Sequence, residues 1–250
     1  MLILVTNDDG IHAPGIAALA ESLAPLGQVV IVAPDRDRSA IGHALTLHAP
    51  LRADELTPGV FAVDGTPTDC VNLGIHGLLP ATPDLVVAGI NRGANLGDDI
   101  TYSGTVSAAM EATLMGVPAL AVSLGGETYT ASEYSNAGGA ALFLARKTLQ
   151  DGLPVDTFLN VNVPSGRIRG MRLTRQGRRR YADMVVEKLD PRGRKYYWLG
   201  GGECDFEYLD GTDCHALHEG FISVTPLHLD LTNFQSFECL SLWNADYPVG

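Results

Sequence analysis

The hydrophobic and polar positions divide the chain up to Pro164 into short apolar runs separated by segments with helical periodicity. Continuous runs rich in Val, Ile and Leu, with helices between them, are typical of a mostly parallel sheet covered on both faces. The sequence therefore predicts an α/β fold, whose ligands bind outside the carboxyl ends of the strands. Strands are expected at 2–6, 28–33, 45–52, 60–63, 84–89, 118–123 and 157–163, and helices at 15–25, 66–78, 104–115 and 132–150.

The pattern changes after Pro164, where basic residues gather at 175–195 and are followed by Tyr196, Tyr197 and Trp198. A glycine triplet at 200–202 and a strand-like run at 222–227 come next. We interpret residues 165–250 as a β-rich extension and hairpin of a single domain spanning 1–250, with residues 1–164 as its core. The exposed aromatic and basic composition of this arm suggests a contact between subunits.

Composition narrows the classes of partner. The chain has 250 residues, is 46% hydrophobic and 18% charged, and carries a formal net charge of −12, so a nucleic-acid polymer is an unfavourable partner. No apolar run is long enough to span a membrane and no signal peptide precedes the first strand, which predicts a cytoplasmic protein. The four cysteines match no zinc spacing and are expected to be reduced thiols, mostly buried.

Two adjacent carboxylates, Asp8 and Asp9, follow the first strand, and Gly10 allows the backbone to turn directly afterwards. Close carboxylates repel each other unless a cation neutralises them, and hard oxygen ligands suit Mg²⁺, Mn²⁺ or Ca²⁺. Taken alone, the pair is equally consistent with an Asx-turn or a helix cap.

The second strand leads into a charged loop that contains Ser39, whose hydroxyl could serve a metal or a phosphate. Arg36 and Arg38 either face an anion or pair with neighbouring aspartates in solvent. His43 is either catalytic or a loop histidine with its hydrogen bonds satisfied, and we favour the second interpretation.

The third core strand ends near Asn91, whose amide oxygen suits a hard metal. Small hydroxyl residues and glycine then open a helix around Ser103 and Thr105, and such helix N-termini present amides to an anion. Capping alone explains either hydroxyl. It does not explain why three successive strand ends supply oxygen ligands beside an anion cradle, and this convergence indicates a phosphate-processing site.

These segments together resemble the family of stationary-phase survival protein E, the SurE-type nucleotidases. The combination of NDDG with the block NLG…YSGTVSAAME is specific, whereas either part alone is much less so. The matching segments are VTNDDG at 5–10, APDRDRSAIGHALT at 33–46, GTPTDCVNLG at 65–74, GINRGANLGDDITYSGTVSAAMEA at 89–112, LNVNVP at 159–164 and GTDCHALHEGFISVTPLHLDLT at 211–232.

The resemblance implies a Rossmann-like three-layer sandwich with a mostly parallel sheet, and a C-terminal β extension that forms a homodimer or homotetramer. It implies a 5′-nucleotidase that hydrolyses nucleoside 5′-monophosphates, with 3′-monophosphates and short polyphosphate as further substrates. One divalent metal ion per subunit, Mg²⁺ or Mn²⁺, with Ca²⁺ as a substitute in a crystal, would be the cofactor. The implied metal ligands are Asp8, Asp9, Ser39 and Asn91, and the implied phosphate-binding residues are Asn95, Ser103, Gly104 and Thr105.

Two parts of the chain depart from the family pattern. Ala112 stands where glycine is common, and Cys214-His215 with His218 lies in a segment that varies. The first is expected to affect packing more than chemistry, and the second bears on subunit contacts and the substrate edge.

The expected mechanism is attack by a metal-activated water, which Asp8 or Asp9 orients as a catalytic residue. A phosphorylated aspartate is the mechanistic alternative. A nucleotide- or phosphate-binding module without catalysis is the functional alternative. The chain lacks the G-x-G-x-x-G of a dinucleotide-binding strand and the G-x-S-x-G of a serine hydrolase, which disfavours both of those classes.

Overall fold

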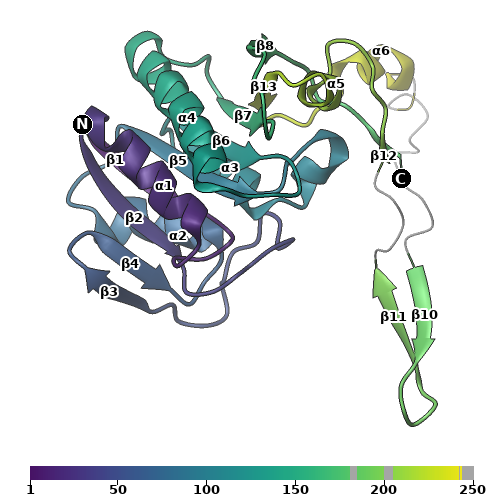
Figure 1. Cartoon of the computed structure of the whole chain (residues 1–250), viewed down its shortest axis with the longest axis horizontal. Coiled ribbons are helices and arrows are strands. Elements are labelled where there is room, and N and C mark those ends of the chain that lie inside the picture. Colours follow the sequence, from purple (N-terminus) through teal and green to yellow (C-terminus); the bar gives the residue numbers. More distant parts are fainter. Residues whose placement is uncertain (181–184, 200–204, 242, 244–250) are drawn as a thin grey trace, which may run out of the picture.

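A nine-stranded sheet forms the centre of the computed structural model, which describes residues 1–180, 185–199, 205–241 and 243 (Figure 1). The strands pair in parallel except at β3–β4 and β7–β13. This mostly parallel sheet confirms the predicted α/β fold. Its order is β3 (Ala53–Thr57), β4 (Val60–Val63), β2 (Gln28–Pro34), β1 (Leu2–Thr6), β5 (Leu85–Arg92), β6 (Ala119–Leu124), β7 (Thr157–Val163), β13 (Ile222–His228) and β8 (Met171–Leu173).

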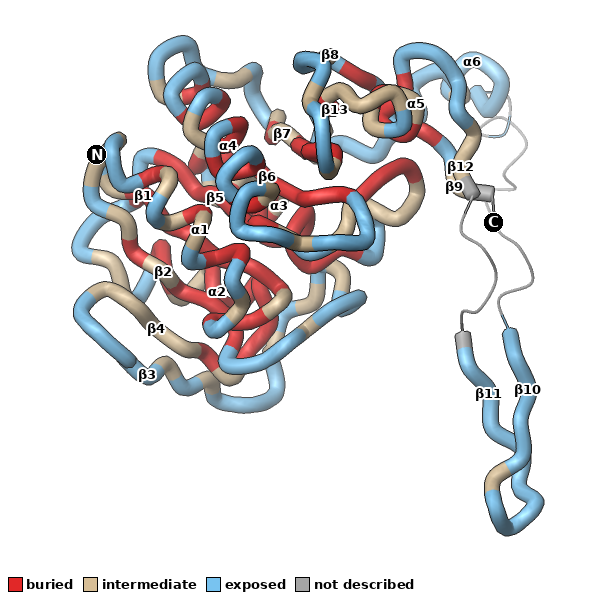
Figure 2. Tube along the Cα trace, viewed as in Figure 1, coloured by how far each residue is buried: buried red, intermediate tan, exposed pale blue. Residues whose placement is uncertain are grey.

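Helices cover both faces of the sheet, because alternate side chains of each buried strand point to opposite sides. In β1, Ile3 and Val5 pack with α1 (Pro14–Leu23) and α4 (Ala131–Asp151), whereas Leu4 packs with α2 (Pro67–Leu73) and α3 (Gly104–Leu114). Figure 2 shows the central strands buried between these layers. The three-layer arrangement predicted from the sequence is therefore present.

Local signals explain where the helices begin. Thr66 and Asp69 form a capping box at the start of α2, with Pro67 in the first turn, and Thr130 and Glu133 do the same for α4. Ser103 caps α3 by accepting a hydrogen bond from the N–H of Val106. After α1 and α2 the chain continues in short helical turns at Ala24–Leu26 and Gly74–Leu78, so the predicted helices at 15–25 and 66–78 correspond to composite elements.

The strand predicted at 45–52 is wrong, since the structure places a strand, β3, at Ala53–Thr57 instead. The N–H and hydroxyl of Thr46 donate to the carboxylate of Asp69, and the Thr66 hydroxyl donates to the carbonyl of Ala44. These bonds tie the apolar-looking segment to the start of α2 rather than to a neighbouring strand.

The extension after Pro164 contributes to the central sheet as well as to separate pieces. β13 and β8 continue the sheet beyond β7, and α5 (Asp213–His218), which the hydrophobic pattern did not predict, packs against β13. The strand-like run at 222–227 is confirmed as β13. The other elements are β9 (Arg179–Arg180) paired with β12 (Asp205–Phe206), the hairpin of β10 (Val185–Leu189) and β11 (Lys195–Leu199), and α6 (Phe237–Leu240).

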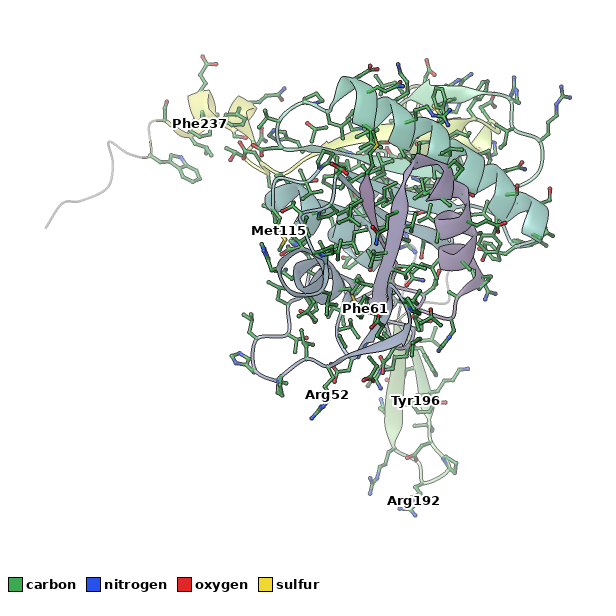
Figure 3. All side chains as sticks on the ribbon, turned by 90° about the vertical axis from the view of Figure 1, so that its left-hand side faces the viewer. Arg52, Phe61, Met115, Arg192, Tyr196 and Phe237 are labelled. Atoms are coloured by element: carbon green, nitrogen blue, oxygen red, sulfur yellow. The ribbon has the colours of Figure 1, made fainter. Side chains whose placement is uncertain are left out.

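The β10–β11 hairpin stands away from the body of the molecule, as Figure 1 and the side-chain view of Figure 3 show for Tyr196 and Arg192. The glycine triplet at 200–202 lies outside the described residues. Cys70 and Cys214 are buried free thiols and Cys239 is an exposed one, while Cys204 is outside the described part of the chain. No helix in that described part combines the length and apolarity needed to cross a membrane.

Candidate metal and phosphate site

The carboxyl end of β1 carries Asp8 and Asp9 into a tight turn. Asp8 is buried, with 4% of its surface exposed, and Asp9 is half-buried. Gly10 has φ +94° and lies against the backbone of Arg36, a position where a side chain would be strained and would collide. The Asn7 amide donates to the carbonyl of Gly10 at 2.8 Å, which closes the turn.

The N-terminus of α3 holds Asp8 in place. The hydroxyl of Thr105 donates to Asp8 Oδ1 at 2.5 Å, and the Thr105 N–H donates to Asp8 Oδ2 at 3.2 Å. Gly104 allows this approach, because a Cβ at that residue would lie 2.8 Å from Asp8 Cβ and 2.9 Å from Asp8 Oδ2. The helix therefore supplies two donors and the space that the carboxylate occupies.

Asp9 is attached to the end of β5, the strand that carries Asn91. The N–H of Arg92 donates to Asp9 Oδ2 at 2.9 Å, which fixes the second carboxylate against this strand. The pairing of β5 with β6 shifts register between Ala88 and Asn91, and bulges of this kind re-aim side chains near functional sites. The Asn91 amide nitrogen donates to the carbonyl of Gly93 at 2.8 Å, and its Oδ1 has no donor among the residues that the structure describes.

Ser39 lies on the exposed loop after β2. Its N–H and hydroxyl both donate to Asp37 Oδ1, at 2.7 and 2.5 Å. The loop is attached to β1 by the N–H of Arg38, which donates to the carbonyl of Asp8 at 2.8 Å. Arg36 and Arg38 both approach Asp35, at 3.6 and 3.8 Å, in agreement with the ion-paired alternative for these two cations.

The surroundings of Asp8 and Asp9 disfavour the ionised form of both carboxylates. Burial raises the pKa of Asp8, against hydrogen bonds from Thr105 that lower it. Burial also raises the pKa of Asp9 to about 6, with the charges of Asp8 and Asp37 adding to the effect. Desolvation and like charge both disfavour ionised carboxylates, and a bound cation would relieve both penalties.

The predicted ligand set fits a hard divalent cation. It offers two carboxylates, one hydroxyl and one amide oxygen, and Asn7 Oδ1 beside them is a buried oxygen without a hydrogen-bond partner among the described residues. No group of three or more His, Cys, Asp or Glu within those residues is placed to hold a metal. A metal at this edge of the sheet would thus depend on neutral oxygens to complete its shell.

The predicted phosphate-binding residues lie next to this set, but they already serve different structural roles. Ser103 Oγ caps α3, and the Gly104 N–H, at the first position of the helix, has no intrahelical acceptor. Both Thr105 donors are directed to Asp8. Asn95 is buried; its amide donates to Ser123 Oγ at 2.8 Å.

One cavity of about 680 Å³ brings most of the predicted residues together. Asp9, Gly104 and Thr105 do not line it directly, but Thr105 contacts Asp8 and Gly104 lies against it, while Asp9 bonds to the N–H of Arg92. The cavity wall is made of Asp8, Ser39, Ala40, Asn91, Arg92, Gly93, Ala94, Asn95, Asp99, Tyr102, Ser103 and Arg179.

Sequence reasoning missed the side chains that support this wall. Glu111, a buried residue of α3, contacts His43 Nε2 at 2.6 Å and the amide of Asn72 at 2.5 Å. This contact gives one ring nitrogen of His43 a hydrogen-bond partner, in agreement with the favoured interpretation of a loop histidine. The sequence did offer one signal for Glu111, because it is an isolated acidic residue inside an alanine-rich helical stretch.

Asp213 is a second missed residue, fully buried at the start of α5. Its carboxylate accepts from the N–H groups of Gly97 at 2.9 Å and of Gly177 and Cys214 at 2.8 Å. It therefore joins the loop after β5 to the extension, and no local pattern in the sequence reveals such a link across distant segments.

Comparisons with known proteins identify the family of this chain. Residues 3–183 match the family described as Survival protein SurE. The chain is 85% identical over 249 residues to the 5′-nucleotidase SurE of Syntrophotalea carbinolica, covering 100% of both chains. It is 63% identical over 247 residues to the protein of the same name from Geobacter sulfurreducens, covering 98% of this chain and 94% of the relative.

A solved structure also matches. The crystal structure of the SurE protein from Aquifex aeolicus superposes with a TM-score of 0.88 at 44% identity, covering 98% of this chain and 100% of that one. The matching motifs, the parallel sheet with its acidic strand end, and these relatives of nearly equal length together place the chain in the SurE family.

Proposed function

We propose that this chain is a 5′-nucleotidase, a metal-dependent phosphomonoesterase that converts nucleoside 5′-monophosphates to nucleoside and phosphate. The observation that carries the proposal is the single cavity in which Asp8, Ser39 and Asn91 lie beside Ser103 at the N-terminus of α3. The relatives named 5′-nucleotidase SurE, at 85% and 63% identity over nearly the whole chain, support the same activity.

The residues proposed to hold the metal are Asp8, Asp9, Ser39 and Asn91. A divalent ion bound there, Mg²⁺ or Mn²⁺, supplies Lewis acidity and lowers the pKa of a bound water. Thr105 orients Asp8 through its hydroxyl and N–H, and the Arg92 N–H orients Asp9. Either carboxylate is proposed to orient the attacking water, and Asp9 is the less buried of the two.

The phosphate is proposed to sit at the N-terminus of α3. Ser103 and Gly104 begin the helix there, and the amides of a helix N-terminus together with its dipole favour an anion. Asn95 borders the same cavity, and its carbonyl is held by the amides of Asn160 and Asn162 at 2.9 and 3.0 Å. In this proposal Thr105 assists phosphate binding indirectly, by holding Asp8.

The extension is proposed to join subunits. Its hairpin exposes Tyr197 and Trp198, with 57% and 61% of their surfaces accessible, and large exposed aromatic groups of this kind mark protein contacts. The β10–β11 hairpin would then belong to a homodimer or homotetramer, with residues 1–164 as the catalytic core of one domain.

The decisive experiment measures phosphate release from nucleoside 5′- and 3′-monophosphates and short polyphosphate, with Mn²⁺, with Mg²⁺ and with EDTA. We expect metal-dependent turnover that Asp9→Asn lowers by about a hundredfold or more, since such a metal site supplies several kcal/mol at the transition state. Asp54→Asn, an exposed change on β3, serves as the matched control and should retain full activity.

Two outcomes would contradict the proposal. Turnover that survives both EDTA and Asp9→Asn would refute the metal site. A wild-type protein that binds nucleotides but releases no phosphate under any condition would support the binding-module alternative instead.

A further inference from the structure

The cavity beside Asp8 is larger than the predicted metal and phosphate groups require. Its volume of about 680 Å³ lies in the range typical of sites for whole small molecules. Beyond the predicted site residues, its wall includes Asp99, Tyr102 and Arg179. These groups border the space next to the proposed phosphate position.

Tyr102 presents an aromatic ring to this cavity. It directly precedes Ser103, and 58% of its surface is exposed although it is a large aromatic residue. Among the described residues, the aromatic pairs do not include Tyr102, so no other ring covers its face. Within the described residues, the Tyr102 ring is therefore neither packed in the core nor stacked on a neighbouring ring.

The backbone around Tyr102 is held firmly. Its N–H donates to the carbonyl of Asp99 at 3.0 Å, and its carbonyl accepts from the N–H of Gly42 at 3.1 Å. Asp99 forms a partly buried ion pair with Arg179 of β9. The loop is thus fixed on both sides while the ring stays exposed, which is the arrangement expected of a preformed binding surface.

The placement indicates which part of a substrate this ring would meet. Ser103 begins the proposed phosphate cradle, so the group esterified to the phosphate has to continue along the cavity wall, of which Tyr102 is the adjacent aromatic member. A nucleobase has a flat π-face that stacks on an aromatic side chain whatever its hydrogen-bonding edge.

We propose that Tyr102 is the stacking platform for the base of a nucleoside monophosphate. The inference rests on the proposed nucleotidase function and deepens it, because it identifies how the site distinguishes a nucleotide from a phosphate ester without a base. Since stacking is indifferent to base edges, the same platform accepts both purines and pyrimidines.

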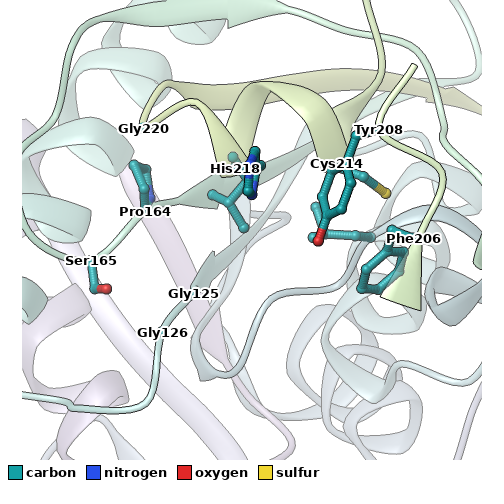
Figure 4. Close-up of a pocket in the computed structure, with 11 residues that line it drawn as sticks. Gly125, Gly126, Pro164, Ser165, Phe206, Tyr208, Cys214, His218 and Gly220 are labelled. Carbon is teal, nitrogen blue, oxygen red and sulfur yellow. The ribbon is translucent and has the colours of Figure 1, made fainter. Parts of the chain in front are cut away.

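A second cavity, also lined by aromatic residues, is the main alternative binding site for the base. It has a volume of about 380 Å³ and is lined by Tyr208, His218 and Phe206, together with Cys214 and Leu217 of α5 (Figure 4). The rings of Tyr208 and His218 already lie 4.4 Å apart, centroid to centroid, and cover each other. None of the predicted metal or phosphate residues lines this second cavity.

The aromatic residues of the β10–β11 hairpin are a less suitable binding site for the base. Tyr196 lies on the β10–β11 hairpin, which projects from the body of the molecule (Figure 1). These residues do not line the cavity of Tyr102.

The test compares kcat/KM for AMP, for UMP and for ribose 5-phosphate, which has the same phosphate ester without a base. It uses the full-length protein with Mn²⁺ and three variants, namely Tyr102→Ala, Tyr102→Phe and Tyr208→Ala. Tyr102→Ala should raise KM for both nucleotides about tenfold, the loss typical of one base stacked on an aromatic ring, and should leave ribose 5-phosphate nearly unchanged. Tyr102→Phe keeps the ring and should keep the preference for nucleotides.

The outcomes separate the inference from the proposed function. Equal losses for all three substrates in Tyr102→Ala, or no loss in any, would overturn the platform. Loss of the nucleotide preference in Tyr208→Ala alone would indicate that the base binds in the second cavity. That result would also overturn the proposal for Tyr102. If the wild type releases phosphate from none of the esters, the proposed function fails, and the platform fails with it. Thermal unfolding of each variant verifies that the fold is intact.

Discussion

Asp8 and Ser39 belong to the same predicted ligand set, yet the molecule positions them in different ways. Asp8 is buried between β1 and the first turn of α3, and its carboxylate receives two hydrogen bonds from Thr105. Ser39 is exposed on a loop and bonds mainly to Asp37, a neighbour in sequence. The core of the fold fixes the first predicted ligand, whereas the second depends on the contacts that attach its loop to the core.

Those contacts form along the whole loop after β2. Arg38 donates to the carbonyl of Asp64 at 2.9 Å, His43 contacts the buried Glu111, and Thr46 bonds to Asp69. Each anchor lies on α2, α3 or the segment leading into α2. Changes at the Asp8 side should therefore affect catalysis most directly, and changes at the anchors should mainly affect how well the loop ligand is presented.

The largest effect is expected from Gly104→Ala. The new Cβ would lie 2.8 Å from Asp8 Cβ and 3.1 Å from Pro67 Cγ, so Asp8 has to move. Displacing a reacting group by about 1 Å can cost on the order of a hundredfold in rate, and overpacking costs about 1–3 kcal/mol of stability. Phosphate release and chemical denaturation measure the two effects.

Gly139→Ala is the matched control for that change. Gly139 lies exposed in α4, and a Cβ there would meet nothing within 4 Å. Activity should stay at the wild-type level, while the free energy of unfolding should rise by about 0.5–1 kcal/mol because alanine favours a helix over glycine. Full activity of Gly104→Ala would show that Asp8 does not need its present position.

A smaller loss is expected from Thr105→Val, which removes the hydroxyl donor to Asp8 and keeps the Thr105 N–H. Losing a partner that orients a metal ligand typically costs about 10–100-fold in metal affinity or activity. Thr105→Ser retains a hydroxyl and should restore most of the activity. If titration with Mn²⁺ gives the same half-saturation for Thr105→Val and wild type, and turnover is also equal, Thr105 does not orient Asp8.

The smallest loss is expected from His43→Leu, which removes the partner of Glu111 without touching the Asp8 side. The Mn²⁺ concentration for half-maximal activity should rise several-fold because the Ser39 loop loses an anchor. Stability should fall by about 1–3 kcal/mol, the cost of a buried polar group without its partner. His43→Gln keeps a donor and should lie between the two proteins.

The exposed pair of Lys147 and Asp151 gives the comparison for this stability change. It joins neighbouring turns of α4 at 2.7 Å with both side chains more than half exposed. Lys147→Ala should alter the free energy of unfolding by only a few tenths of a kcal/mol, since solvent screens such pairs. Equal losses for His43→Leu and Lys147→Ala would show that the Glu111 contact does not anchor the loop.

Local pattern predicted most of the core sheet and its helices correctly. β1, β2, β5, β6 and β7 are rich in apolar residues, and the two capping boxes mark where α2 and α4 begin. The strand predicted at 45–52 fails because its polar partners, Asp69 and Thr66, lie in a different segment of the chain. α5 was missed because a helix of this length, Asp213–His218, gives too little periodicity to detect.

The sequence by itself determined that acidic, hydroxyl and amide groups follow successive strands. It also determined that a helix with glycine in its first turn begins after the third of these strands. Strand period and chain order fix both placements. Only the tertiary structure decided which groups support one another. Thr105 is 97 positions from Asp8, and Gly97 is 116 positions from Asp213, yet each pair shares a hydrogen bond. Such pairs form when the ends of parallel strands and helices come together in the fold. The local sequence around each residue does not indicate which distant residue will become its partner.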